Sequence, residues 1–109
     1  PVPETDGQRF ACVYESLAKC YRDTVRELEA VSGKAFSCIN LVGGGSQDDY
    51  LNQLTANATG KTVYAGPVEA TATGNILCQM MADGVFSGVQ EARETVKASF
   101  PIRTFLPEA

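Results

Sequence analysis

Two short apolar segments, residues 36–42 and 61–65, constrain the fold of this chain more than any other feature of its sequence. Each contains β-branched or aromatic residues and is followed directly by glycine, a pattern typical of a buried strand. The stretch of about 20 residues between them carries apolar residues at helical spacing. A connection of this length that contains a helix predicts a right-handed parallel βαβ unit.

Helical periodicity surrounds this unit on both sides. Apolar residues at steps of three and four predict a first helix from Gln8 to about Ala30 or Val31, stopped by Ser32 and Gly33. Its predicted buried face consists of Phe10, Val13, Leu17, Tyr21, Val25 and Leu28. The same reasoning predicts helices from about residue 46 to Gly60, over 69–82 and over 89–99, and then a short extended tail over 102–105.

The length of 109 residues predicts one domain. Residues 1–7 are polar and contain two prolines, so we interpret them as an incoming linker, with the domain proper over 8–109. Two strands are too few for an independent sheet, because both edges would stay open. The sequence therefore predicts part of a larger α/β sheet. Gly74, in the interior of a predicted helix, indicates close backbone packing at that point.

Composition excludes several classes of chemistry. The chain has no histidine, which rules out a Ser-His-Asp triad or a His-ligated zinc site within it. A net charge of -4 with scattered basic residues argues against nucleic-acid and anionic-membrane partners. The four cysteines lack C-x-x-C spacing and have apolar neighbours, so we expect reduced, packed thiols of a cytoplasmic protein. No segment has the ~18 apolar residues of a membrane span.

A run of three glycines, Gly43–Gly45, follows the first predicted strand and precedes a helix. Glycines allow positive φ angles and a close approach of ligand to backbone, and the amides at the start of a helix favour an anion. Phosphate or nucleotide binding is the functional interpretation, and a tight turn that binds nothing explains the local pattern equally well. Two named motifs fail: Thr55 stands where a Walker A loop needs glycine, and Asp48 stands where a dinucleotide fingerprint needs its third glycine.

A longer set of motifs resembles a known family. The stretches are Leu41-Val42-Gly43-Gly44-Gly45-Ser46-Gln47, Leu51-Asn52-Gln53-Leu54, Gly60, Val63-Tyr64-Ala65-Gly66-Pro67-Val68-Glu69-Ala70-Thr71 and Gly74-Asn75. Together they resemble the C-terminal region of the FGGY family of carbohydrate kinases. The sequence from Gly66 to Asn75 is more similar to the branch of the family that acts on L-rhamnulose than to the glycerol or xylulose kinases.

This resemblance implies a fold and a ligand. The fold would be α/β, with short parallel strands and packed helices, as part of an actin-like, ribonuclease H-like ATPase domain. The glycine turn would approach the phosphates and ribose of ATP through its backbone, with Gly44 at the family's ATP-contact glycine. Asp48 departs from the family, which commonly has asparagine there. The implied ATP-binding residues are Gly43, Gly44, Gly45, Ser46, Gln47 and Asp48.

The family's remaining machinery is absent from these 109 residues. By resemblance, the catalytic aspartate, the residues that hold Mg²⁺ and the sugar-binding residues lie upstream, so we expect no catalytic or metal-binding residue here and no activity of this portion alone. We interpret Asp48, Asp49 and Glu69 as helix-start residues, because acids are favoured in a first helical turn. Two alternatives stay open: a self-contained nucleotide- or phosphate-binding module, and a packing domain whose glycine turn binds nothing.

Overall fold

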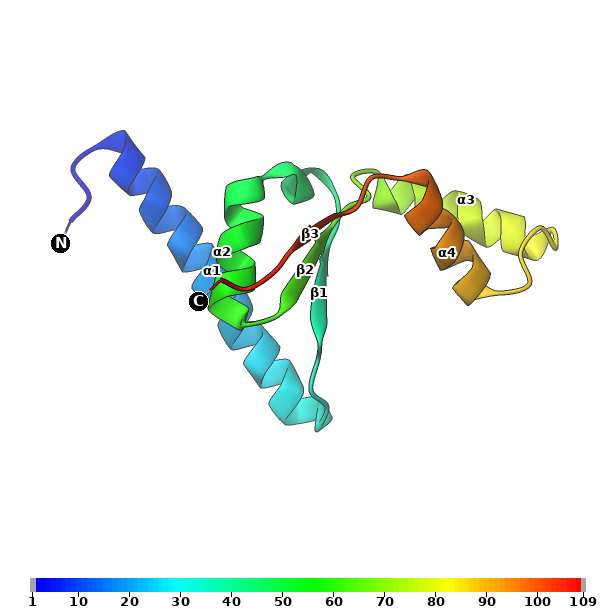
Figure 1. Cartoon of the computed structure of the whole chain (residues 1–109), viewed down its shortest axis with the longest axis horizontal. Coiled ribbons are helices and arrows are strands. Elements are labelled where there is room, and N and C mark those ends of the chain that lie inside the picture. The colour runs from blue at the N-terminus through cyan, green and yellow to red at the C-terminus, as the bar shows by residue number, and fades with distance from the viewer. Residues whose placement is uncertain (1, 109) are drawn as a thin grey trace.

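The fold is seen in a computed structural model that describes residues 2–108 (Figure 1). The elements in chain order are α1 (Asp6–Ser32), β1 (Cys38–Leu41), the 3-10 turn η1 (Gly44–Gln47), α2 (Asp49–Thr59), β2 (Thr62–Ala65), α3 (Ala70–Ala82), α4 (Val89–Ser99) and β3 (Arg103–Phe105). The predicted helix over 89–99 is confirmed at both ends, and the other predicted elements are present with small shifts of their bounds. Within this part of the chain, no helix is both long and apolar enough to cross a lipid bilayer.

The sheet has the order β1-β2-β3 and contains both strand directions. β1 and β2 are parallel, with Ile39 opposite Val63, so the predicted βαβ unit is confirmed. β3 pairs antiparallel to β2, with Phe105 opposite Val63. We expected only an extended tail in this region. A strand of three residues has too little pattern to reveal its partner, so the prediction of parallel strands alone was incomplete.

A capping box starts α1 earlier than the sequence pattern predicts. The hydroxyl of Thr5 accepts a hydrogen bond from the Gln8 amide, and the Gln8 side chain accepts one from the Thr5 amide. The helix consequently begins at Asp6, so the last two residues of the predicted linker are helical. At the other end Gly33 adopts a φ of 65° and its amide bonds to the Glu29 carbonyl, which confirms the predicted stop.

The predicted buried face of α1 is confirmed in part, at Tyr21 and Val25, and is wrong by about one residue around the helix at its other positions. Ala18 is buried, and Tyr14, Tyr21 and Val25 are half-buried, whereas Phe10 of the predicted face is 66% exposed. α1 packs mainly against α2, where Ala56 is fully buried. Small residues let two helices approach closely, and this contact selects the alanine side of α1 over its larger apolar side chains. The apolar residues that consequently stay exposed on α1 are Phe10, Val13, Leu17, Leu28 and Val31.

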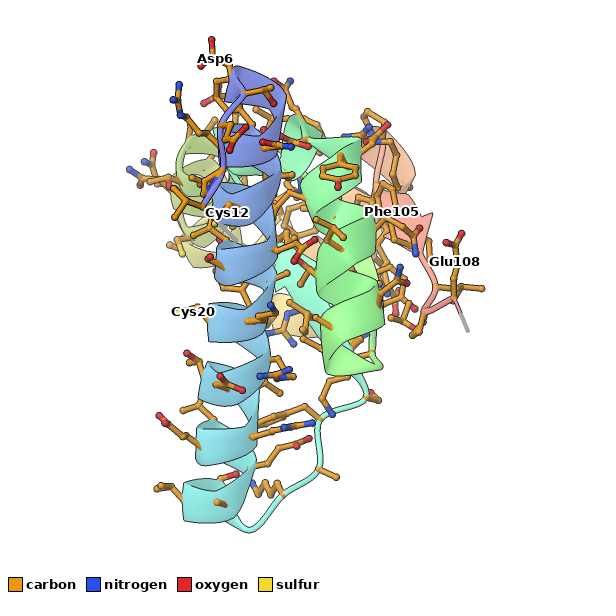
Figure 2. All side chains as sticks on the ribbon, turned by 90° about the vertical axis from the view of Figure 1, so that its left-hand side faces the viewer. Asp6, Cys12, Cys20, Phe105 and Glu108 are labelled. Atoms are coloured by element: carbon orange, nitrogen blue, oxygen red, sulfur yellow. The ribbon has the colours of Figure 1, made fainter. Side chains whose placement is uncertain are left out.

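The prediction of packed cysteines is also wrong for this part of the protein. Cys12, Cys20 and Cys78 are exposed, and Cys38 is half-buried. Figure 2 shows Cys12 and Cys20 along the exposed length of α1. All four are free thiols. Apolar neighbours in sequence misled the prediction, because the face of α1 that carries Cys12 and Cys20 does not contact α2.

The two faces of the sheet are covered differently. Val63 and Ala65 of β2 are buried on the face covered by α2, while Tyr64 between them is exposed on the other. α3 and α4 pack against each other at the end of the molecule opposite α1 (Figure 1). A groove of about 840 Å³ separates α4 from the uncovered face of the sheet, with Tyr64 and Lys97 among its lining residues.

Gly66, directly after β2, and Gly74, inside α3, differ in whether the fold requires glycine. Gly66 has a φ of +121°, and a Cβ atom there would lie 2.8 Å from the Pro101 carbonyl oxygen. A Cβ atom at Gly74 would meet nothing within 4 Å, so the close packing predicted around this residue is absent. Of these two glycines, only Gly66 is required by the backbone.

We predict that Gly66→Ala lowers the free energy of unfolding by about 1–3 kcal/mol, because it combines a strained φ with a backbone clash. The matched variant Gly74→Ala, in an open helical position, should leave stability unchanged or raise it by up to about 1 kcal/mol. Denaturant unfolding of the purified protein measures both. Equal stabilities of the two variants would contradict this account of Gly66.

Candidate functional site

The glycine run forms a turn at the carboxyl end of β1, and only its first residue needs to be glycine for conformational reasons. Gly43 has a φ of 81° and a ψ of -171°. Gly44 and Gly45 have no positive φ, and a Cβ atom on either would meet nothing within 4 Å. Both are exposed. The fold of this chain therefore explains the first glycine and leaves the next two open to an external group.

Hydrogen bonds tie the turn to its surroundings at Gly43 and Ser46. The Gly43 amide donates to the Pro67 carbonyl at 3.3 Å, which joins the end of β1 to the loop after β2. The Gly43 carbonyl accepts from the Ser46 amide at 3.1 Å and from the Ser46 hydroxyl at 2.7 Å. Ser46 is 1% exposed. Its side chain thus closes the turn from within and does not present a donor at the surface.

Asp48 is the N-cap of α2. One carboxylate oxygen accepts from the Leu51 amide at 3.0 Å, and the other accepts from the Tyr14 hydroxyl at 2.6 Å. The hydrogen bond from Tyr14, and then that from the Leu51 amide, hold the pKa of the Asp48 carboxyl below its ordinary value. The Tyr14 ring also lies edge-on to Tyr50, with centroids 5.5 Å apart. The predicted helix-start role of Asp48 is confirmed.

Because Asp48 caps α2, the amides that we expected to bind an anion are not those at the start of this helix. We predicted that α2 would begin at Ser46 or Gln47 and offer its free amides to a ligand, but it begins at Asp49 and Asp48 occupies the Leu51 amide. A 3-10 turn lies between the glycines and the helix. The first amides of such a turn lack intrahelical partners, so the amides of the exposed residues Gly44 and Gly45 are the donors left for a ligand.

The six predicted site residues therefore divide into two groups. Gly44, Gly45 and Gln47 are exposed, whereas Ser46 is buried and Gly43 and Asp48 are half-buried. Gln47 also lines a small groove of about 370 Å³ beside the turn, together with Ser46, Gly66, Val68 and Arg103. The exposed group can meet a ligand, and the other group holds the turn in shape.

Arg103 is a site residue that the sequence pattern did not reveal. Its guanidinium forms an ion pair with Asp49 and donates to the Ser46 carbonyl at 2.8 Å. It comes from β3, far from the glycine run in sequence. The only local signal was one cation in a short tail, which gives no indication of where that tail lies.

The carboxylates beside the turn do not fit a metal ion. Asp48 accepts hydrogen bonds at both oxygens, and Asp49 is paired with Arg103. Within residues 2–108, no three His, Cys, Asp or Glu side chains gather closely enough to hold a metal ion. These residues therefore do not form a metal site of their own.

Comparisons with known proteins agree with the motifs. Residues 1–82 match the model of the C-terminal domain of the FGGY family of carbohydrate kinases. A rhamnulokinase of Bacillus subtilis (strain 168) is 47% identical over 107 residues, which is 98% of this chain and 22% of that protein. A rhamnulokinase of Bacteroides thetaiotaomicron is 44% identical over 108 residues, 99% of this chain and 22% of that protein. The chain thus spans about a fifth of the length of these curated relatives.

We predict that Tyr14→Phe destabilises the protein at pH 7. Losing the hydroxyl donor returns the pKa of Asp48 toward its ordinary value of about 3.8. The lowered pKa contributes its full stability above the ordinary value, and this contribution is lost as the pH falls toward the folded-state pKa. The difference from wild type should therefore shrink as the pH falls through the folded-state pKa of Asp48. The hydrogen bond to Asp48 raises the pKa of Tyr14 above its ordinary value of about 10. The stability difference between Tyr14→Phe and wild type should therefore also shrink as the pH rises through the raised pKa of Tyr14.

Thermal unfolding from pH 3 to pH 7 tests the acid limb of this prediction. Tyr21→Phe on the same helix is the matched control, because no hydrogen bond of the Tyr21 hydroxyl is found within residues 2–108. A Tyr14→Phe effect that stays constant across this range would contradict the assignment to Asp48.

Proposed function

Because the chain belongs to the FGGY family of carbohydrate kinases, we propose that it is the ATP-facing C-terminal portion of a kinase that phosphorylates L-rhamnulose. The C-terminal domain of this family is part of the actin-like ATPase fold, and the predicted α/β class is confirmed. We propose the sugar from the two relatives, both of which are rhamnulokinases, and from the sequence resemblance around Gly66.

The observation that carries the ATP-binding proposal is the open surface over Gly44 and Gly45. The backbone does not require glycine at either position, and no neighbour would obstruct a Cβ atom. A side chain at either position would instead occupy the space where a ligand approaches the main chain. Backbone amides at this place suit the phosphate oxygens or ribose hydroxyls of a nucleotide.

The role of this chain in phosphoryl transfer is positioning. The reaction needs the nucleotide held in line with its acceptor, a divalent cation that neutralises charge on the phosphates, and a base for the attacking hydroxyl. We propose that the glycine turn holds one part of ATP. Mg²⁺, the catalytic base and the sugar pocket would belong to the remaining part of the kinase, since Asp48 and Asp49 are already paired.

The surface of the chain supports a place within a larger protein. Phe10, Val13, Leu28 and Val31 of α1 are all more than half exposed. Several exposed apolar side chains on one helix support an interface with another part of the protein. The exposed free thiols on α1 and α3 support a reducing setting, and we place the reaction in the cytoplasm.

We predict that Gly44→Val, in a longer kinase that contains this chain, raises the KM for ATP at least tenfold, which corresponds to about 1.4 kcal/mol of binding free energy. The valine side chain would cover the amides that the nucleotide needs. The KM for L-rhamnulose and the unfolding temperature should change little, because a Cβ atom at Gly44 meets nothing within 4 Å. Coupled ADP-release kinetics measure both KM values.

Gly7→Val is the matched control for this experiment. Gly7 lies in the first turn of α1, and a Cβ atom there also meets nothing within 4 Å. Unchanged ATP kinetics in Gly44→Val would favour the packing-domain alternative, in which the turn binds nothing. Kinase activity with ATP but without dependence on L-rhamnulose would reject the sugar and retain the ATP site.

We also predict that this chain alone has no kinase activity and binds ATP with a dissociation constant of about 1 mM or weaker, equivalent to about 4.1 kcal/mol. A few backbone hydrogen bonds must work against the repulsion between a protein of net charge -4 and a polyanion. Isothermal titration calorimetry measures the affinity. Micromolar binding would instead support a self-contained nucleotide-binding module.

A further inference from the structure

We infer that Arg103, on β3, positions the glycine turn for ATP. This inference rests on the proposed function, because it concerns the same turn. It adds a residue that lies more than 50 positions after the glycines and is brought to them by the antiparallel pairing of β2 with β3, in which Arg103 stands opposite Ala65.

Arg103 acts on the turn through a hydrogen bond to the Ser46 carbonyl. This carbonyl accepts one hydrogen bond from the Asn52 amide group at 2.8 Å and a second from the Arg103 guanidinium at 2.8 Å. Ser46 in turn closes the glycine turn through two bonds to the Gly43 carbonyl. The direction of the exposed Gly44 and Gly45 amides is thus set from two sides, by α2 within the fold and by β3 near the surface.

The two donors to the Ser46 carbonyl, Asn52 and Arg103, differ in their burial and so in their contribution to packing. Asn52 is fully buried, and its side-chain oxygen is the one buried side-chain acceptor without a partner among residues 2–108. Replacing it would disturb the packing beneath the turn. The Arg103 side chain is 44% exposed, and its guanidinium carbon lies 6.0 Å from the centre of the Phe105 ring on its own strand. Arg103 can therefore be exchanged with less effect on the core.

Arg103 also controls the charge that a nucleotide meets. Two consecutive carboxylates, Asp48 and Asp49, follow the turn directly. The guanidinium of Arg103 pairs with Asp49, while Asp48 is engaged by the Tyr14 hydroxyl and keeps its negative charge. Without Arg103, both charges would act on the phosphates of ATP. Arg103 thus fixes the geometry of the turn and offsets one of the two carboxylates beside it.

The test compares variants of the full-length kinase that contains this chain. Arg103→Met should raise the KM for ATP about tenfold and leave the KM for L-rhamnulose and the unfolding temperature close to wild type. Arg103→Lys should recover part of the loss, because an ammonium can still pair with Asp49 but lacks the planar fork that also reaches Ser46. Arg93→Met, which removes a cation on α4 away from the turn, should change none of these values.

A second-site variant separates the two contributions of Arg103. Adding Asp49→Asn to Arg103→Met removes the unpaired carboxylate, so part of the ATP affinity should return. The recovery should grow smaller as the salt concentration rises, because salt screens the charge that Asp49→Asn removes. A merely structural role would give neither the rescue nor its dependence on salt.

Three results would overturn the inference. An unchanged KM for ATP in Arg103→Met would show that the turn does not need this residue. Equal rises in both KM values together with a lower unfolding temperature would assign Arg103 to stability alone. A wild-type protein without ATP-dependent activity on L-rhamnulose would reject the proposed function first, and this failure is visible in the wild-type measurement before any variant is compared.

Discussion

The parallel pairing of β1 with β2 is the constraint on which the rest of the structure depends. It places the ends of the two strands side by side, so that the Gly66 amide donates to the Leu41 carbonyl at 2.8 Å and the Gly43 amide to the Pro67 carbonyl at 3.3 Å. The glycine turn thereby starts from a fixed point. β3 then adds to the other side of β2 and brings Arg103 to the same end of the sheet.

Local patterns predicted the elements well because helix and strand signals are local. The αL glycine at the end of α2, Gly60 with a φ of 68°, and the acidic residue at its start were both readable from sequence. The buried face of α1 was predictable only in part, at Tyr21 and Val25. Periodicity ranks apolar residues, and it favoured Phe10 and Val13, but the contact with α2 is made on the side of Ala18, where two helices can approach closely.

The candidate site was predictable only in part, for the same reason. The glycine run and its place after a strand are adjacent in sequence, so the turn could be located. A 3-10 turn and the first turn of an α-helix have nearly the same local signals, and the sequence could not show that Asp48 would cap α2 separately. The contacts of Tyr14 with Asp48 and of Arg103 with Ser46 join segments 34 and 57 residues apart, and single-sequence reasoning has no access to such pairs.

A turn of this kind separates the residues that shape a site from the residues that touch its ligand. The inward side chains of Ser46 and Asp48 hold the backbone, and the exposed amides of Gly44 and Gly45 carry no side-chain chemistry of their own. This division also fits the asparagine that the resemblance implies in place of Asp48. Either side chain can accept a hydrogen bond from the Leu51 amide, so the cap survives the exchange. The exchange adds a negative charge, and the Tyr14 hydroxyl donates to the carboxylate oxygen that the Leu51 amide does not use.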